Sequence, residues 1–235
     1  MNLEQREVAV KIVYYGPALS GKTTNLQSLH LMLEPRHRGK LMSLETHLDR
    51  TLFFDLLPLQ YQTPSGLRVK VKLFTVPGQV IHNETRRAVL AGADAVVFVA
   101  DSQRSQALSN SLSFKNLKEN LKVNNIDFNT LPIVIQFNKR DLENIKPVEE
   151  IRRDWGPTRF PTFLSIATKG KGVFETFEAI LRMAFKSIDQ KYDFNRKFQF
   201  DPEDFINQLK SERIKSAIDL KPYLVTSGEA KDLIK

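Results

Sequence analysis

The chain has 235 residues, and its 35 lysines and arginines exceed its 27 aspartates and glutamates, giving a formal net charge of +8. It contains no cysteine, which excludes a disulfide scaffold and a cysteine-ligated metal site and favours a cytoplasmic location. No apolar run is long enough to span a bilayer, and neither terminus carries a lipidation signal, so we expect no direct lipid anchor. The basic clusters, among them Arg86-Arg87, are short and lack interleaved aromatic residues. We interpret them as solvated surface and expect no nucleic-acid partner.

The first predicted elements are an apolar strand over residues 8–15, a glycine-bounded loop and a helix to about residue 33. The loop spells G-x-x-x-x-G-K-[ST] in full, a pattern whose backbone N–H groups and helix N-terminus cradle phosphates. Lys22 supplies a positive charge for the β- and γ-phosphates, and the Thr23 hydroxyl is a candidate Mg²⁺ ligand. The nucleotide contacts expected here are Gly16, Ala18, Leu19, Ser20, Gly21, Lys22, Thr23 and Thr24. The chain is predicted to bind a nucleoside phosphate.

The remaining elements alternate between strands and helices. Residues 36–56 are polar and predicted to be irregular, and they are followed by strands at 56–62 and 67–76 that form an antiparallel edge hairpin. Further along come a short helix through 86–87, a buried strand at 96–100, a helix at 106–123, a buried strand at 133–137, a strand at 162–166 and a helix from 173 to about 189. We place Leu108, Leu112, Leu117 and Leu121 on the apolar side of the helix at 106–123. The pattern predicts an α/β fold of the P-loop NTPase type, with a mostly parallel, doubly wound six-stranded sheet.

The base is indicated by Asn138-Lys139-Arg140-Asp141, an N-K-x-D sequence at the end of a buried strand. The Asp141 carboxylate can accept two hydrogen bonds from guanine, and adenine offers no matching pair of donors. Asn138 is expected to tie this loop to the phosphate loop, and the Lys139 stem to lie along the base. Residues Ala167 and Thr168 follow the last strand, and the backbone N–H of Ala167 is expected to face guanine O6. A solvated turn is the alternative interpretation, and the matching phosphate loop makes guanine the better one.

The order of these motifs resembles that of the Ras-like small GTPases. More narrowly, Asp49-Arg50-Thr51-Leu52-Phe53-Phe54-Asp55, Thr75-Val76-Pro77-Gly78-Gln79 and the segment 97–102 resemble the bacterial MglA family of gliding and cell-polarity proteins, over about residues 8–185. The resemblance implies a Ras-like G domain, GTP/GDP and Mg²⁺ as ligands, and a roadblock-type (MglB-like) GTPase-activating partner. It also implies control of cell polarity and of gliding or type IV pilus motility. We expect a monomeric G domain, effectors at residues 44–56 and 75–90, and partner-driven recruitment to a pole or the inner membrane.

Four residues are candidates for reactive roles. Thr51 lies in the loop after the first helix, where it could contact Mg²⁺ and the γ-phosphate, and Gly78 could donate its backbone N–H to that phosphate. Gln79 is the candidate for orienting the attacking water. Arg50 could act as an arginine finger supplied in cis, or it could form only a surface ion pair; the resemblance favours the finger.

Two positions depart from the usual Ras-like pattern. Thr75 stands where most members carry an aspartate that holds a Mg²⁺-bound water, which predicts weaker Mg²⁺ binding. Asp55 could compensate, although we favour an ordinary exposed carboxylate. Ala18 stands where many members carry glycine, so its methyl group would face the γ-phosphate and an arginine finger. We therefore expect slow intrinsic hydrolysis.

The chain divides into a predicted Ras-like GTPase domain at 1–185 and a partly helical C-terminal extension at 186–235. Asp201-Pro202 is a strong helix start, and packing of this helix against the GTPase core is favoured over a partner-binding arm. The leading functional hypothesis is a GTP-hydrolysing molecular switch that is slow without an activating partner. A GTP-bound interaction scaffold with negligible hydrolysis is the alternative, and Asp141 disfavours a P-loop ATPase or small-molecule kinase.

Overall fold

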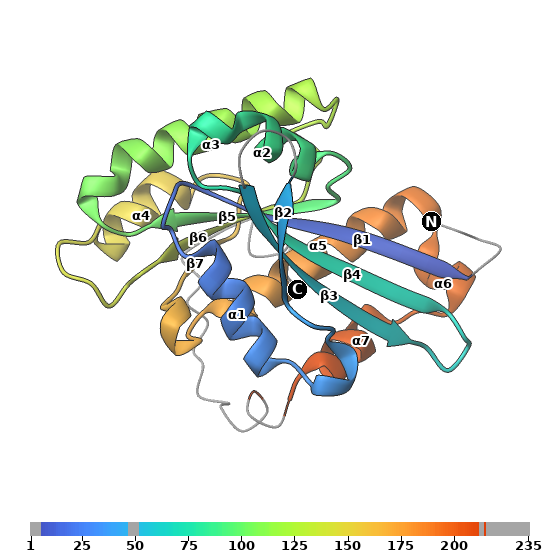
Figure 1. Cartoon of the computed structure of the whole chain (residues 1–235). Coiled ribbons are helices and arrows are strands. Elements are labelled where there is room, and N and C mark those ends of the chain that lie inside the picture. Colours follow the sequence, from blue (N-terminus) through green and yellow to red (C-terminus); the bar gives the residue numbers. More distant parts are fainter. Residues whose placement is uncertain (1–5, 47–51, 212–213, 215–235) are drawn as a thin grey trace.

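The structure, a computed structural model, describes residues 6–46, 52–211 and 214 (Figure 1). Its strands are β1 (Glu7–Tyr15), β2 (Met42–Thr46), β3 (Leu52–Gln62), β4 (Arg68–Thr75), β5 (Ala95–Asp101), β6 (Ile133–Asn138) and β7 (Thr162–Leu164). Its α-helices are α1 (Lys22–Met32), α2 (Asn83–Leu90), α3 (Ala107–Val123), α4 (Val148–Trp155), α5 (Val173–Tyr192), α6 (Phe194–Phe198) and α7 (Pro202–Leu209). None of the helices described is long and apolar enough to cross a bilayer.

The strands form one sheet in the order β2-β3-β4-β1-β5-β6-β7. Strands β4, β1, β5, β6 and β7 run parallel, whereas β2, β3 and β4 are joined by antiparallel pairs. The predicted α/β fold with a mostly parallel sheet is confirmed. Because parallel strands end at one edge of the sheet, the loops after β1, β5, β6 and β7 gather at that edge.

Within the described residues the sheet has seven strands, in place of the predicted six. The additional strand is β2, which pairs with the first half of β3 in a segment that we expected to be irregular. Its sequence, Met-Ser-Leu-Glu-Thr, is short and half polar, which is typical of an edge strand and gives a weak periodic signal. The predicted hairpin of β3 and β4 therefore lies inside the sheet, between β2 and β1.

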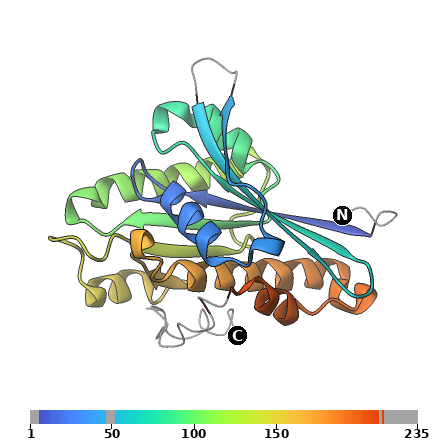
Figure 2. The same cartoon turned by 60° about the horizontal axis from the view of Figure 1, so that its bottom comes forward.

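Helices cover both faces of the sheet (Figures 1 and 2). On one face, α1, α5 and α7 pack against side chains such as Ile12 and Tyr14 of β1; on the other, α2, α3 and α4 pack against Val13 and Tyr15 of the same strand. Successive residues of a strand point to opposite faces, so a strand covered on both sides becomes a continuous apolar run. All seven residues of β5 are accordingly buried.

Helix α3 buries a different stripe from the one predicted. Leu117 and Leu121 reach the core, but Leu108 and Leu112 are 69% and 53% exposed. The buried stripe of α3 also includes the polar residues Ser113, Asn116 and Asn120. Asn116 accepts a hydrogen bond from the Tyr15 hydroxyl, both asparagines donate to Asn83, and Ser113 accepts from Arg86, so these polar groups are satisfied. The positions of the apolar residues alone could not reveal a buried stripe of this kind.

The C-terminal helices pack against the sheet, as predicted. Helix α5 continues past residue 185 to Tyr192, and Phe194, Phe200 and Phe205 form an aromatic cluster with Phe185. Figure 2 shows α6 and α7 lying beside α5. Asp201 caps α7 by accepting a hydrogen bond from the Glu203 N–H, and the helix ends at Leu209. The boundary at 185/186 stays a prediction.

Replacing Phe205 tests this packing. The ring is fully buried, with its centroid 5.0 Å from that of Tyr61 and 5.8 Å from that of Phe185. We expect Phe205→Ala to lower the free energy of unfolding by about 3–5 kcal/mol, because it opens a cavity and removes a large apolar surface. Urea denaturation measures the change. The control is Tyr192→Ala, since Tyr192 is 51% exposed. An equally small decrease in the free energy of unfolding in both variants would contradict packing of the extension against the core.

Candidate nucleotide-binding site

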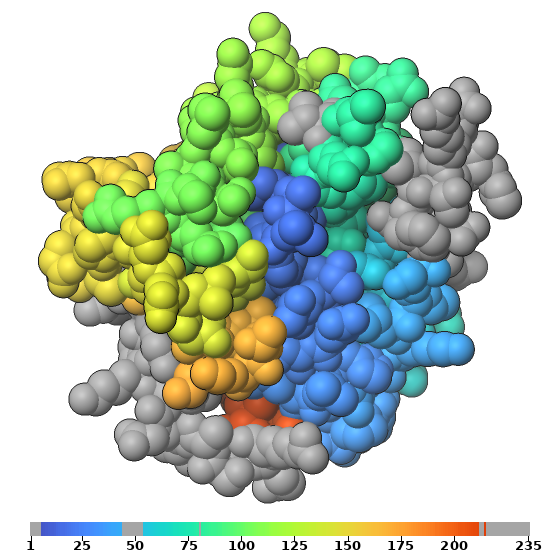
Figure 3. Space-filling model, turned by 60° about the vertical axis from the view of Figure 1, so that its left-hand side comes forward, coloured from blue at the N-terminus to red at the C-terminus, as the bar shows by residue number. Residues whose placement is uncertain are grey.

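The phosphate loop joins the end of β1 to the start of α1 and curls as the glycines in the sequence predict. Gly16 has φ 152°, and a Cβ there would lie 2.2 Å from the Val99 carbonyl oxygen. Gly21 has φ 96°, and a Cβ there would lie 2.3 Å from Asn138 Nδ2. Neither position can hold a side chain without displacing a neighbour. In Figure 3 the blue segment that carries this loop and α1 lies in the centre of the face, beside the yellow-green segment that follows β6.

Lys22 lies inside this loop and is 6% exposed. Its ammonium group donates hydrogen bonds to the carbonyl oxygens of Gly16 (3.1 Å) and Pro17 (2.6 Å). The pKa of Lys22 is lowered to about 7, mainly by burial and also by the charge of Arg86, while the charge of Asp55 opposes the shift. The phosphate loop therefore holds a desolvated cation, whose charged form a nearby anion would favour.

Asn138 joins the phosphate loop to the predicted guanine loops. Its Nδ2 donates to the Ser20 carbonyl (2.9 Å), while its Oδ1 accepts from Ser165 Oγ (3.1 Å) and from the Ala167 N–H (2.9 Å). Asn138 and Ser165 are 2% and 1% exposed, so the junction is shielded from water. The expected tie between the two loops is present. The Ala167 N–H already has an acceptor, so its predicted bond to guanine O6 requires that this N–H be shared or released.

The other residues of the N-K-x-D sequence lie on the same side of this junction. Lys139 has φ 66°, and its ammonium group donates to Asp101 Oδ2 at 2.6 Å. Asp101 is 4% exposed, so the pair holds the lysine against the end of β5. Asp141 stays partly accessible, with one carboxylate oxygen 3.5 Å from Lys169 Nζ. The exposed Thr168 follows Ala167 in the same loop. Asp101 was not predicted as a site residue.

Asp55 is buried, which corrects our preference for an exposed carboxylate. It is 6% exposed, and its Oδ2 accepts hydrogen bonds from Thr23 Oγ1 (2.6 Å) and Thr75 Oγ1 (2.9 Å). Its Oδ1 accepts from Ser43 Oγ (2.7 Å). The strand register explains the cluster. On one side of β3, Ser43 of β2 pairs directly with Asp55. On the other side lies Thr75 of β4, whose Oγ1 accepts a hydrogen bond from the Asp55 N–H (2.8 Å).

The donor set at Asp55 suits Mg²⁺. This ion binds one or two carboxylates together with phosphate oxygens and waters, and here a carboxylate lies beside the phosphate-loop hydroxyl of Thr23. Within the described residues, no three acidic or histidine side chains gather into a ready metal cluster. A metal at this position would therefore depend on Asp55, Thr23 and the bound phosphates.

The Pro77-Gly78-Gln79 loop lies against the phosphate loop. A Cβ on Gly78 would be 2.2 Å from Ala18 Cα, so the two backbones are in direct contact. Gln79 is exposed, at the start of the turn that leads into α2. The other two candidates for reactive roles, Arg50 and Thr51, lie outside the described residues. Of the expected phosphate-loop contacts, Leu19 is 87% exposed and Thr24 is half-buried.

Arg86 is buried, contrary to our interpretation of the basic clusters as solvated surface. It is 0% exposed, with Nη2 2.9 Å from Ser113 Oγ, Nη1 3.5 Å from the Gly78 carbonyl, and its guanidinium over the Tyr15 ring at 4.4 Å. Burial lowers the pKa of Arg86. Among the described residues, no carboxylate pairs with it. Arg86 thus links the Gly78 loop to β1 and α3, which the sequence did not reveal.

Comparisons with known proteins agree with this geometry. The family model of the ADP-ribosylation factor family matches residues 1–184. The chain is 45% identical over 188 residues to the mutual gliding-motility protein MglA of Myxococcus xanthus, a match covering 80% of this chain and 96% of that relative. It is 28% identical over 172 residues to the Ras-related protein Rab-28 of Caenorhabditis elegans, covering 72% of this chain and 64% of that relative. The predicted resemblance and the Ras-like G-domain fold are confirmed. The chain therefore belongs to the ADP-ribosylation factor family and is an MglA-like small GTPase.

Proposed function

We propose that this chain is a GTP/GDP switch that controls cell polarity and gliding or type IV pilus motility, with Mg²⁺ as its metal ion. The observation that carries the switch is the junction at Asn138, which joins the phosphate loop to the guanine loops. The biological setting is supported by the printed name and the 45% identity of the Myxococcus relative. In this proposal the effectors bind residues 44–56 and 75–90, and a roadblock-type partner accelerates hydrolysis.

In this proposal, Asp141 is the residue that selects guanine. Its carboxylate is partly accessible next to the Asn138 junction, so a base stacked along the Lys139 stem could reach it. Because a desolvated carboxylate left unpaired is unfavourable, adenine nucleotides should bind poorly. Gly16, Gly21 and Lys22 hold the phosphates.

Asp55 takes part in Mg²⁺ binding in place of an acid at position 75. The hydrogen bond from Thr23 fixes that hydroxyl with its oxygen lone pairs free for a metal ion. The carboxylate of Asp55 supplies the negative charge that Thr75 lacks, and it can accept hydrogen bonds from metal-bound water. Thr23 and Asp55 would hold the Mg²⁺ ion, and the ion would supply positive charge that offsets the charge of the phosphates.

Hydrolysis relies on Gln79 and Arg50. Gln79 orients the attacking water, Gly78 donates its N–H to the γ-phosphate, and Arg50 and Thr51 close on the same phosphate. The close contact between Gly78 and Ala18 leaves little room beside the phosphate loop, which supports slow hydrolysis until the activating partner rearranges the loops. The alternative is a scaffold that binds GTP with negligible hydrolysis, and Thr75 and Ala18 favour it. The hydrolysis assay below distinguishes this scaffold from a GTP-hydrolysing switch.

Nucleotide selectivity is tested by titrating GTP, GDP, ATP and xanthosine diphosphate. We expect tight binding of GTP and GDP only. In Asp141→Asn, loss of two charge-assisted hydrogen bonds should weaken GDP binding by roughly 10²–10⁴-fold and improve xanthosine diphosphate binding. The matched control is Glu143→Gln, an exposed carboxylate in the same loop. Equal affinity for ATP and GTP in the native chain would disprove the guanine assignment.

The role of Asp55 is tested by titrating Mg²⁺ against the release rate of a fluorescent GDP analogue. We expect Asp55→Asn to raise the Mg²⁺ concentration needed for retention by about 10–100-fold, the usual effect of losing a carboxylate beside a metal site. Adding Thr75→Asp to this variant should recover part of the loss, because it returns a carboxylate to the neighbouring strand. An unchanged Mg²⁺ dependence in a folded Asp55→Asn variant would refute the role.

Single-turnover GTP hydrolysis with and without a roadblock-type activator tests the reactive residues. We expect slow basal turnover, strong stimulation, and a loss of stimulated rate of about 10³–10⁵ in Arg50→Ala. Gln79→Leu should also abolish stimulation. Arg36→Ala is the control, since Arg36 is exposed and contacts Gln208. Stimulated hydrolysis that survives Arg50→Ala would rule out the finger, and no hydrolysis under any condition would favour the scaffold.

A further inference from the structure

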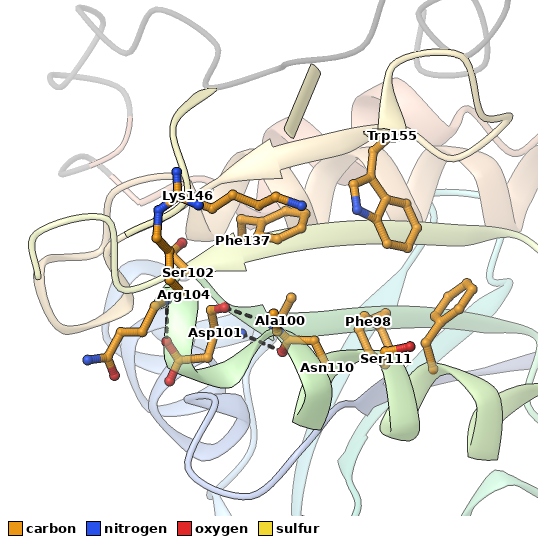
Figure 4. A pocket seen from close by; sticks show the side chains of 13 residues that line it. Phe98, Ala100, Asp101, Ser102, Arg104, Asn110, Ser111, Phe137, Lys146 and Trp155 are labelled. Carbon is orange, nitrogen blue, oxygen red and sulfur yellow. Dashed lines mark hydrogen bonds between the residues drawn. The ribbon is translucent and has the colours of Figure 1, made fainter. Parts of the chain in front are cut away.

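A cavity of about 300 Å³ opens between α3 and the segment that connects β6 to α4, outside the predicted nucleotide site. Figure 4 shows Phe137, Lys146 and Trp155 on one side of it and Asn110 and Ser111 of α3 on the other. Its volume lies at the lower end of the roughly 300–1,000 Å³ range typical of small-molecule sites. The cavity is large enough for a small ligand.

Aromatic rings make up much of the wall. The rings of Phe114 and Trp155 meet edge to face with centroids 5.3 Å apart, and Phe137 lies 6.1 Å from Trp155. These three side chains line the cavity. Flat apolar walls of this kind favour a planar aromatic ligand, because such a ligand can stack on the rings or contact them edge to face.

Ser102 provides one buried polar group in this wall. It is 1% exposed, and its hydroxyl has no hydrogen-bond partner among the described residues. Its backbone groups are both occupied, since the N–H donates to the Asn138 carbonyl (3.0 Å) and the carbonyl accepts from the Lys146 N–H (2.8 Å). A buried hydroxyl without a partner is unfavourable, so this group is poised to bond an occupant of the cavity.

The cations at the rim are already paired. Lys146 donates to Asp154 at 2.5 Å, and Arg104 lies 3.2 Å from Glu150. An anionic ligand would have to compete with these carboxylates, whereas a neutral ligand would not. The chemistry of the cavity therefore favours an uncharged aromatic molecule with one hydroxyl group.

We propose that this cavity binds a small, neutral, hydroxyl-bearing aromatic molecule, and that its occupancy changes the affinity of the chain for guanine nucleotides. The ring lies against Phe114, Phe137 and Trp155, and the hydroxyl bonds to Ser102. The effect on nucleotide affinity rests on the proposed function, whereas the cavity itself does not.

The path between the two sites is short. Ser102 is bonded to the Asn138 backbone, and its neighbour Asp101 accepts from Lys139 Nζ at 2.6 Å. Asp101 is also held to α3, because its N–H and carbonyl both bond to the side chain of Asn110 (3.0 and 2.8 Å). A ligand that shifts α3 or Ser102 therefore acts on two residues of the predicted guanine loop. Such coupling must be reciprocal, so nucleotide should change the affinity for the aromatic ligand by the same factor.

The probe for the experiment is 6-fluoro-2-naphthol, followed by fluorine NMR and by quenching of Trp155, the single tryptophan of the chain. We expect saturable binding to the full chain and about 2- to 10-fold weaker binding of 2-fluoronaphthalene, which lacks the hydroxyl. Ser102→Ala should remove this difference. Ala107→Phe, which fills the cavity from α3, should abolish binding, and Leu108→Phe on the exposed side of α3 should not.

Coupling is measured as the GDP dissociation constant with and without saturating probe. We expect a change of about fivefold or more in the native chain and none in Ala107→Phe. Absence of saturable binding, or equal binding to Ala107→Phe, would overturn the site, and an unchanged GDP affinity would overturn the coupling. Probe binding is first measured without nucleotide. A chain that binds the probe but does not prefer guanine would therefore contradict the proposed function and leave the cavity assignment standing.

Discussion

The side-chain amide of Asn138 fixes the relative positions of the loops on which the site depends. From the end of β6, it contacts the phosphate loop at Ser20 and the loop after β7 at Ser165 and Ala167. Gly21 must lack a side chain because a Cβ would lie 2.3 Å from this amide. Asn138 and its three partners are buried, so each donor or acceptor left unpaired there would be unfavourable by about 1–3 kcal/mol. The junction therefore holds phosphate and base contacts in one arrangement.

The same reasoning separates what the sequence could predict from what it could not. The phosphate loop and the N-K-x-D loop are local patterns, in which spacing alone determines which groups converge, and the structure brings the two loops together as expected. Burial of Asp55 depends on the register of three strands, one of which, β2, carries almost no periodic signal. Arg86 sits beside Arg87 in a sequence that favours a charged surface, and only the packing of α2 against Tyr15 and Ser113 reveals that it is buried.

The geometry of Asp55 also explains how an MglA-like chain can carry threonine at position 75. Adjacent strands of a sheet lie about 4.8 Å apart, so a carboxylate on β3, bonded to Thr75 of β4, can reach the Thr23 hydroxyl. Here it accepts hydrogen bonds from Thr23 and Thr75 together. Negative charge beside the phosphate loop is thus supplied by Asp55 on β3, a residue that lies within the predicted effector segment 44–56. The chain thus departs from the Ras-like pattern at position 75 and still has a carboxylate next to the Thr23 hydroxyl.

Two buried cations, Lys22 and Arg86, connect the charge at the phosphate loop to the position of the Gly78 loop. Burial lowers the pKa of both, which means that the fold opposes their charges until an anion lies nearby. Arg86 also contacts the Gly78 carbonyl, and Gly78 in turn touches Ala18 of the phosphate loop. A change in charge at the phosphate loop therefore acts directly on the backbone of the Gly78 loop, and a displacement of that loop must be accommodated by Tyr15 and α3. These contacts connect the two buried cations to the backbone of the Gly78 loop, which is the kind of connection that a switch requires.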